Sequence, residues 1–168
     1  MEGGRALAEV LLGQVEPSGR LPISFAVHVG QQPTYYNQIR GQHGNRYADL
    51  TQRPAWAFGE GLSYTTVEYS GVAVREDQLT VEGTLAVDVT LANTGDRPVL
   101  ETVQLYISDE VTTYSWADKE LKAYRQVSLQ PGESVTVTLE LPVAECTIVD
   151  AEGRRVVEPG AFTALVGP

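Results

Sequence analysis

From residue 67 onward, apolar and polar side chains alternate with a period of two along several segments. The alternation is clear over 85–91, 103–107 and 135–141, where valine, leucine or isoleucine occupies every second position. Because successive side chains of a β-strand point to opposite faces, this period predicts strands with one buried face. The segments are separated by short runs rich in Gly, Pro and Asn that favour tight turns, at 93–96, 130–133 and 158–160.

Roughly seven short strands at this spacing predict an antiparallel β-sandwich of the immunoglobulin or fibronectin type III kind. The chain contains one cysteine, Cys146, so the Cys, Trp, Cys core of antibody domains is missing and the fibronectin-like variant is favoured. A single cysteine forms no internal disulfide and leaves the redox compartment open. We interpret Cys146 as a small buried strand residue.

The first 66 residues follow a different pattern. Apolar residues between Arg5 and Leu12 share one helical face, and Gly13 stands where helices commonly end, so one short helix is expected. Residues 21–25 form a brief extended segment containing Pro22, which disfavours central pairing in a sheet. From 26 to 62 no period is sustained. The predicted fold is therefore mainly β, with a short helix and a long irregular linker before the sandwich.

The irregular linker is rich in aromatic side chains. Residues 25–69 hold eight of the chain's thirteen aromatics. Long loops without regular structure are uncommon in compact domains unless they are functional or pack against a larger body. The linker is therefore expected to need a surface to cover.

Charge is distributed unevenly between the two parts. The chain carries a net charge of −10, of which residues 1–70 contribute −1 and the remainder −9. Because phosphate groups require clustered Lys and Arg, nucleic acid and anionic membranes are excluded as expected partners. No apolar run reaches the roughly 20 residues that cross a bilayer. The first residues do not show a secretory signal, and localisation is left open between a cytoplasmic and a secreted parent.

Several motifs occur in an order that resembles one family. The string FGEGLSYTTVEY lies at 58–69. It follows GRALAEVLLGQVEPSGRLPISF and GQQPTYYN, and it precedes VTLANTGDRPVLETVQLYISD, KELKAYRQVSLQPGESVTVTLEL and VEPGAFTALVG. The ordered set spans nearly the whole chain and resembles the C-terminal end of a glycoside hydrolase family 3 β-glycosidase, of the β-glucosidase or β-xylosidase type.

The resemblance implies a division into three parts. Residues 1–25 correspond to the C-terminal remnant of an α/β sandwich domain, 26–66 to a linker that runs back across that domain, and 67–168 to a fibronectin type III-like module. It also implies a parent that hydrolyses β-glycosides with retention, a reaction that needs two carboxyl groups about 5 Å apart. In the family both lie upstream of the matched segment. No catalytic residue is therefore assigned, and the chain is expected to be a structural module that is inactive alone.

Other chemistry-bearing residues receive structural interpretations. The carboxylates of Glu101, Asp109, Glu110 and Glu120 are expected to be surface groups. His28 and His43 lack a partner at metal-ligand spacing, so neither a metal site nor a cofactor is proposed. Ser63 lies outside the context of a nucleophile elbow and is interpreted as a turn or packing residue.

Three linker aromatics are candidates for binding a sugar. Trp56, Tyr35 and Tyr36 could line an outer subsite, because sugar rings present apolar faces that stack on aromatic side chains. The favoured alternative is that they anchor the linker against neighbouring domains. The candidate partners are thus the upstream catalytic domains, a glycan, and a second copy of the chain bound through the linker. A carbohydrate- or polymer-binding β-sandwich, with Trp116 on a separate loop, remains the alternative function.

Overall fold

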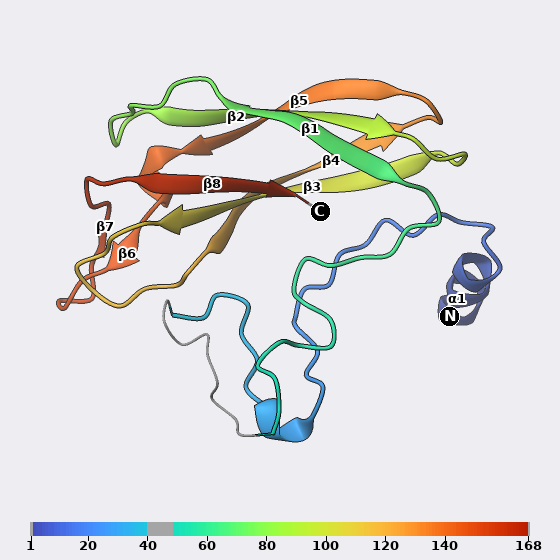
Figure 1. The fold of residues 1–168 in the computed structure, drawn as a ribbon, viewed down its shortest axis with the longest axis horizontal. Helices are drawn as coiled ribbons and strands as arrows, with labels where there is room; N and C mark the ends of the chain where they lie inside the picture. Colours follow the sequence, from blue (N-terminus) through green and yellow to red (C-terminus); the bar gives the residue numbers. More distant parts are fainter. Residues whose placement is uncertain (1, 40–48, 168) are drawn as a thin grey trace.

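A computed structural model describes residues 2–39 and 49–167. Two antiparallel three-stranded sheets face each other in it (Figure 1). One sheet has the order β1-β2-β5, and the other has the order β4-β3-β8. The strands are β1 (Val67–Val74), β2 (Thr84–Asn93), β3 (Val99–Asp109), β4 (Glu120–Leu129), β5 (Ser134–Pro142) and β8 (Phe162–Gly167). The predicted antiparallel β-sandwich is confirmed.

The core lies between the two sheets and is built from the alternating positions. Val87, Val89 and Leu91 of β2 face Val103 and Leu105 of β3, and all five are fully buried. Burying each of these side chains contributes about 1.5–3 kcal/mol. The alternation of apolar and polar residues therefore determines both where the strands form and which face of each strand is buried.

The connection from β5 to β8 contains three short elements. The 3₁₀ helix η2 (Val143–Glu145) is followed by a hairpin of β6 (Ile148–Val149) and β7 (Arg155–Val156). Cys146 lies in the bend after η2 and is half-buried. The prediction that Cys146 is a buried strand residue is therefore wrong, because η2 interrupts the strand pattern before it.

The two sheets meet differently along their two sides. β4 and β5 are edge strands that lie against each other on one side. β1 and β8 are the edges on the other side, and no direct pairing joins them within the described residues. β1 is also irregular between Ser70 and Ala73, around Gly71 with φ of +59°, which makes this edge a poor template for a further strand.

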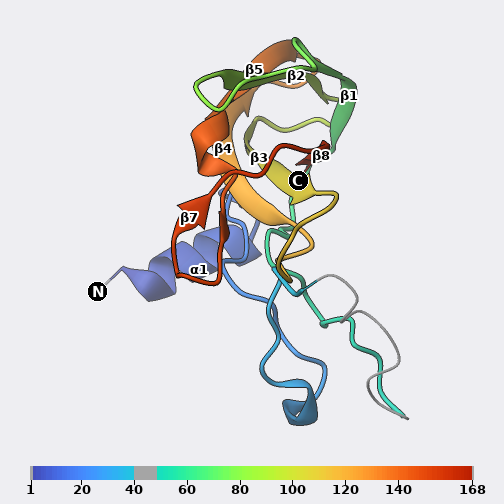
Figure 2. The same cartoon turned by 90° about the vertical axis from the view of Figure 1, so that its left-hand side faces the viewer.

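The residues before the sandwich form one helix, followed by a long segment that is mostly irregular. Helix α1 (Gly3–Leu11) ends just before Gly13, which has φ of +67°, as its position in the sequence predicted. The 3₁₀ helix η1 (Val29–Gln31) interrupts the segment expected to be irregular. Helix α1 and the irregular segment after it lie on the side of the sandwich formed by the β4-β3-β8 sheet (Figure 2). The division at residues 25 and 66 stays a prediction.

Candidate domain interface

Strand β3 is the platform on which the linker rests. Its residues from Val103 to Ser108 are all buried. Val103, Leu105 and Ile107 face the sandwich core, whereas the alternate side chains face the opposite way. A strand buried on both faces requires a second layer, and the linker supplies that layer.

Gly59 and Gln104 join the linker to this outer face. The Gln104 side-chain amide donates to the Gly59 carbonyl oxygen at 3.0 Å, and the Tyr106 hydroxyl donates to Gln104 Oε1 at 3.0 Å. Gly59 has φ of +83°, and a Cβ at this position would lie 2.4 Å from the Tyr106 hydroxyl oxygen. Both the backbone and the contact therefore require glycine here.

Aromatic rings extend this contact. Tyr36 stacks on Phe58 with ring centroids 3.9 Å apart, and both rings meet Tyr106 edge to face at 6.3 and 6.5 Å. The Leu121 backbone N–H donates to the Tyr36 hydroxyl at 3.3 Å. Burial, aided by the neighbouring Tyr36, raises the pKa of Tyr106. Tyr36 is thus committed to holding the linker on the module.

Arg20 enters the sandwich near its β1 edge. Its guanidinium donates to the Glu101 carboxylate, which also accepts from the Tyr69 hydroxyl at 2.6 Å. Glu101 is 5% exposed, so the expectation that it is a surface group is wrong. Glu101 lies two positions from both Val99 and Val103, so its side chain shares the buried face of β3 with theirs. This position in the sequence is the signal that identifies it as buried. Burial and the bond to Glu101 raise the pKa of Tyr69.

A second cluster fixes the segment after α1. The Glu16 carboxylate accepts from the Tyr64 backbone N–H and from the Ser63 hydroxyl, each at 2.6 Å. The Tyr64 hydroxyl donates to the Val10 carbonyl at 2.8 Å, and Arg97 lies over the Tyr64 ring at 5.2 Å. The Ser63 hydroxyl also accepts from the Thr65 backbone N–H at 3.1 Å, and the interpretation of this serine as a turn or packing residue stays a prediction. The string around 58–64 therefore ties the helical segment to the module.

The residues before the sandwich leave many apolar side chains uncovered. Helix α1 buries no residue, although a nine-residue helix is too short to be stable alone. Most of the large apolar side chains that are exposed among the described residues lie before residue 67. They are Leu7, Leu11, Leu12, Val15, Ile23, Phe25, Val27, Val29, Tyr35, Ile39, Trp56, Leu62 and Tyr64. We call this set of exposed apolar side chains, which lie within residues 3–39 and 49–64, the apolar face.

The structure separates the candidate sugar-binding residues. Trp56, 49% exposed, pairs with Phe25 through a β-bridge and lines an apolar hollow of about 600 Å³. Tyr35 and Tyr36 line a different hollow of about 470 Å³, which also contains Arg53 and Lys119. The three aromatics line two separate hollows, and their role in binding a sugar stays a prediction.

The two histidines and the loop tryptophan have separate positions. His28 caps η1, because its Nδ1 accepts from the Gly30 backbone N–H at 3.0 Å, whereas His43 lies outside the described residues. Trp116 donates from Nε1 to Glu120 at 3.1 Å. Among residues 2–39 and 49–167, no group of His, Cys, Asp and Glu is placed to hold a metal ion. No helix in these ranges is long and apolar enough to cross a membrane.

Two family models match the chain in succession. Residues 1–64 match the glycosyl hydrolase family 3 C-terminal domain, and residues 101–168 match the fibronectin type III-like domain. The first match contains α1 and the apolar face, and the second contains most of the β4-β3-β8 sheet.

Curated relatives and solved structures align over almost all of the chain. A periplasmic β-glucosidase from Salmonella typhimurium is 34% identical over 99% of this chain and 23% of its own length. A β-xylosidase from Formosa agariphila is 37% identical over 99% of this chain and 24% of its own length. The structure of a β-glucosidase involved in saponin metabolism from intestinal bacteria superimposes with a TM-score of 0.93 at 57% identity, covering 99% of this chain and 23% of that one.

The chain therefore spans about a quarter of the length of these relatives. The matched order of motifs, the two family models and the fold agree with one another. The chain belongs to glycoside hydrolase family 3, and its residues correspond to the C-terminal part of that family's β-glycosidases.

Proposed function

We propose that this chain is the C-terminal structural part of a β-glycosidase that acts on β-glucosides or β-xylosides. In this role the sandwich and the linker pack against catalytic domains and supply no catalytic group themselves. The relatives include both a β-glucosidase and a β-xylosidase, so the sugar remains open at this level.

The apolar face carries the proposal. Contiguous exposed apolar patches larger than several hundred Å² mark surfaces that bind a partner. Here exposed apolar side chains lie on α1 and at the Phe25–Trp56 bridge. The opposite side of the same segment is fixed to β3 through Gln104 and Glu101. One side is thus held by the module and the other is left for an upstream domain.

The described carboxylates favour a role outside catalysis. Glu101, the most buried acidic residue described, is bound by Arg20 and Tyr69. A retaining glycosidase needs a nucleophile and an acid/base directed at a substrate cleft. Glu101 is instead directed into an ion pair, which supports a structural use of this acid.

A complementation experiment tests the proposal. The 168-residue chain is mixed with a family 3 β-glucosidase from which the matching C-terminal quarter has been deleted. We expect no release of nitrophenol from a nitrophenyl β-glucoside by the chain alone, and co-elution with the truncated enzyme that raises its melting temperature or its activity. The control carries Phe25→Ser and Trp56→Ser and should not co-elute. Hydrolysis of the nitrophenyl β-glucoside by the purified chain alone would refute the proposal.

A glycan-binding role is the second candidate, and the hollow at Tyr35 is the observation that favours it. Tyr35 is 63% exposed, and Arg53 and Lys119 line the same hollow. An exposed aromatic face beside hydrogen-bond donors is suited to a sugar ring. Calorimetric titration with cello- and xylo-oligosaccharides tests this role, with Tyr35→Ala as the variant and Tyr124→Ala, at an exposed tyrosine on β4, as its control. If the parent chain releases no heat of binding, or if Tyr35→Ala binds the oligosaccharide as the parent does, a sugar site at Tyr35 is excluded.

A further inference from the structure

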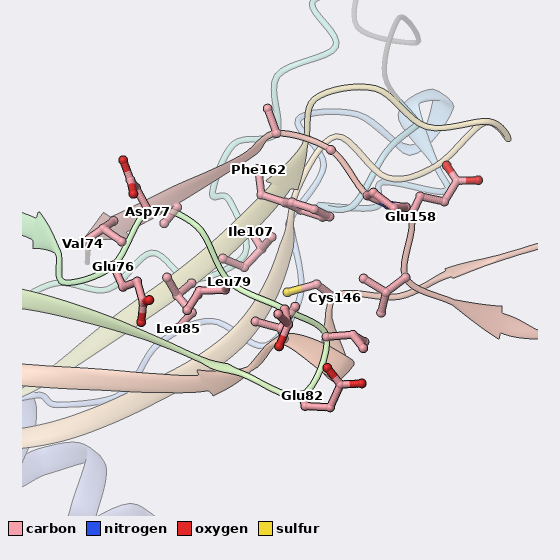
Figure 3. Close-up of a pocket in the computed structure, with 18 residues that line it drawn as sticks. Val74, Glu76, Asp77, Leu79, Glu82, Leu85, Ile107, Cys146, Glu158 and Phe162 are labelled. Atoms are coloured by element: carbon pink, nitrogen blue, oxygen red, sulfur yellow. The ribbon is translucent and has the colours of Figure 1, made fainter.

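A pocket of about 720 Å³ lies at the open side of the sandwich, between the ends of the edge strands β1 and β8 (Figure 3). The connection from β1 to β2 forms one wall, and the turn before β8 forms another. The volume falls within the roughly 300–1,000 Å³ typical of small-molecule sites. The pocket is made entirely from the sandwich half of the chain and includes no residue of the apolar face.

The inner wall of the pocket is apolar. Leu85 of β2, Ile107 of β3 and Phe162 of β8 line it, together with Leu79 and the Cys146 thiol. Figure 3 shows Leu79, Leu85, Ile107 and Cys146 in its middle. Because β1 and β8 do not pair, no strand in the described part of the chain closes this side of the core. A ligand with an apolar tail or ring would bury its surface against these groups.

The charges around the pocket have one sign. Four acidic residues line it, Glu76, Asp77, Glu82 and Glu158, and none of its lining residues within 2–39 and 49–167 is Lys or Arg. Glu158 is anchored, since it accepts from the Thr113 backbone N–H at 2.8 Å. Among the described residues, no hydrogen bond or ion pair engages the carboxylates of Glu76 and Glu82. These two groups are therefore available to a ligand.

Charges of both signs lie near Cys146 at the inner end of the pocket. Lys122 lines a small neighbouring hollow that shares Ile107, Cys146 and Phe162 with the pocket, and it is paired with Glu120 at 3.1 Å. Burial raises the pKa of the Cys146 thiol, and the charges of Asp109, Glu145 and Glu120 act in the same direction against that of Lys122. The four acidic lining residues would repel an anion that enters the pocket and attract a cation.

We propose that this pocket binds small organic cations that carry an apolar tail or ring, with the tail against Leu85 and Ile107 and the charge beside Glu76 and Glu82. The site is separate from the surface that carries the proposed function, so either can hold without the other. Binding requires the apolar wall for affinity and the acidic rim for the choice of charge.

Three eight-carbon probes test the proposal on the 168-residue chain: octyltrimethylammonium, 1-octanol and octanesulfonate, each below its micelle-forming concentration. Cys146 is the only cysteine, so the rate of its alkylation by neutral iodoacetamide reports occupancy of the pocket. We expect the cation to slow alkylation at the lowest concentration, the alcohol at a higher one, and the sulfonate least. Added salt should weaken protection by the cation and leave protection by the alcohol unchanged.

Matched charge variants locate the site. The double variant Glu76→Gln, Glu82→Gln should bind the cation roughly fivefold more weakly, as two exposed ion pairs imply, and should bind octanol as before. Glu68→Gln removes a carboxylate from β1 outside the pocket and should change neither. The proposal is overturned if the sulfonate protects as well as the cation, if no probe protects, or if the double variant retains full preference for the cation.

Discussion

Arg20 and Glu101 lie 81 positions apart in the sequence, and their side chains form a buried ion pair where segment 1–25 contacts the sandwich. The Tyr69 hydroxyl completes the contact by donating to the same carboxylate oxygen. The Glu101 carboxylate of the module is thereby satisfied by one residue of the module, Tyr69, and by one residue of the segment before it, Arg20. Segment 1–25 and the sandwich are consequently expected to unfold together.

Removing Arg20 should cost stability well beyond an ordinary surface change. Arg20→Met leaves the Glu101 carboxylate buried without its cation, which typically costs about 3–5 kcal/mol. The free energy of unfolding from urea denaturation measures the loss. Arg5→Met breaks the exposed pair with Glu9 and should leave the midpoint nearly unchanged. Equal effects of the two substitutions would contradict the assigned burial.

Gly59 should tolerate alanine less well than Gly132 does. Both have positive φ, +83° and +76°, but only at Gly59 would the added Cβ meet the Tyr106 hydroxyl. Each Gly→Ala change costs about 1 kcal/mol or more from its backbone, and Gly59→Ala adds the steric clash. Urea denaturation of both variants measures the difference. Combining Gly59→Ala with Tyr106→Phe should recover part of the loss, and no recovery would locate the strain elsewhere.

Alkaline pH should reveal the contribution of Tyr69. Its pKa in the folded chain is raised above the ordinary value of 10.0 by burial and by Glu101. The stabilisation is therefore fully present below pH 10 and declines as the pH rises above it, because the unfolded chain ionises first. Tyr69→Phe should be the less stable protein at pH 8, and its difference from the parent should shrink above pH 10. A difference that is constant from pH 8 to 11 would refute the assignment.

The apolar face should drive self-association when no upstream domain covers it. Light scattering after gel filtration should detect pairs of the 168-residue chain that become monomers in the Phe25→Ser, Trp56→Ser variant. Val111, 81% exposed on the sandwich, provides the control substitution Val111→Ser, which should leave the pairs intact. Monomers of the parent chain at all concentrations would exclude a dimer formed through the linker.

The sandwich could be predicted because its signal is local. The alternation from Leu85 to Leu91 requires only the strand itself to place the side chains, and β2 follows it residue by residue. The end of α1 at Gly13 was predictable for a similar reason, since a glycine with positive φ terminates a helix wherever it occurs.

The interface could not be predicted to the same degree because its partners are remote in sequence. Glu101 carried a readable signal, an acid at an inward strand position, but nothing near Arg20 identifies it as the partner. Tyr36 resembled a free stacking platform, and only the fold shows its ring occupied by Phe58. η1 was missed because His28 and Gln31 form a capping box that hydropathy does not register.

The burial of β3 on both faces has a consequence for how the protein tolerates mutation. An ordinary sandwich strand accepts polar substitutions at every second position, which faces solvent. In a scan of all substitutions, tolerant and intolerant positions therefore alternate along such a strand. Along 103–108 each position faces either the core or the linker. This strand should therefore show an unbroken block of intolerance, and the outward half of that block should relax if the linker is deleted.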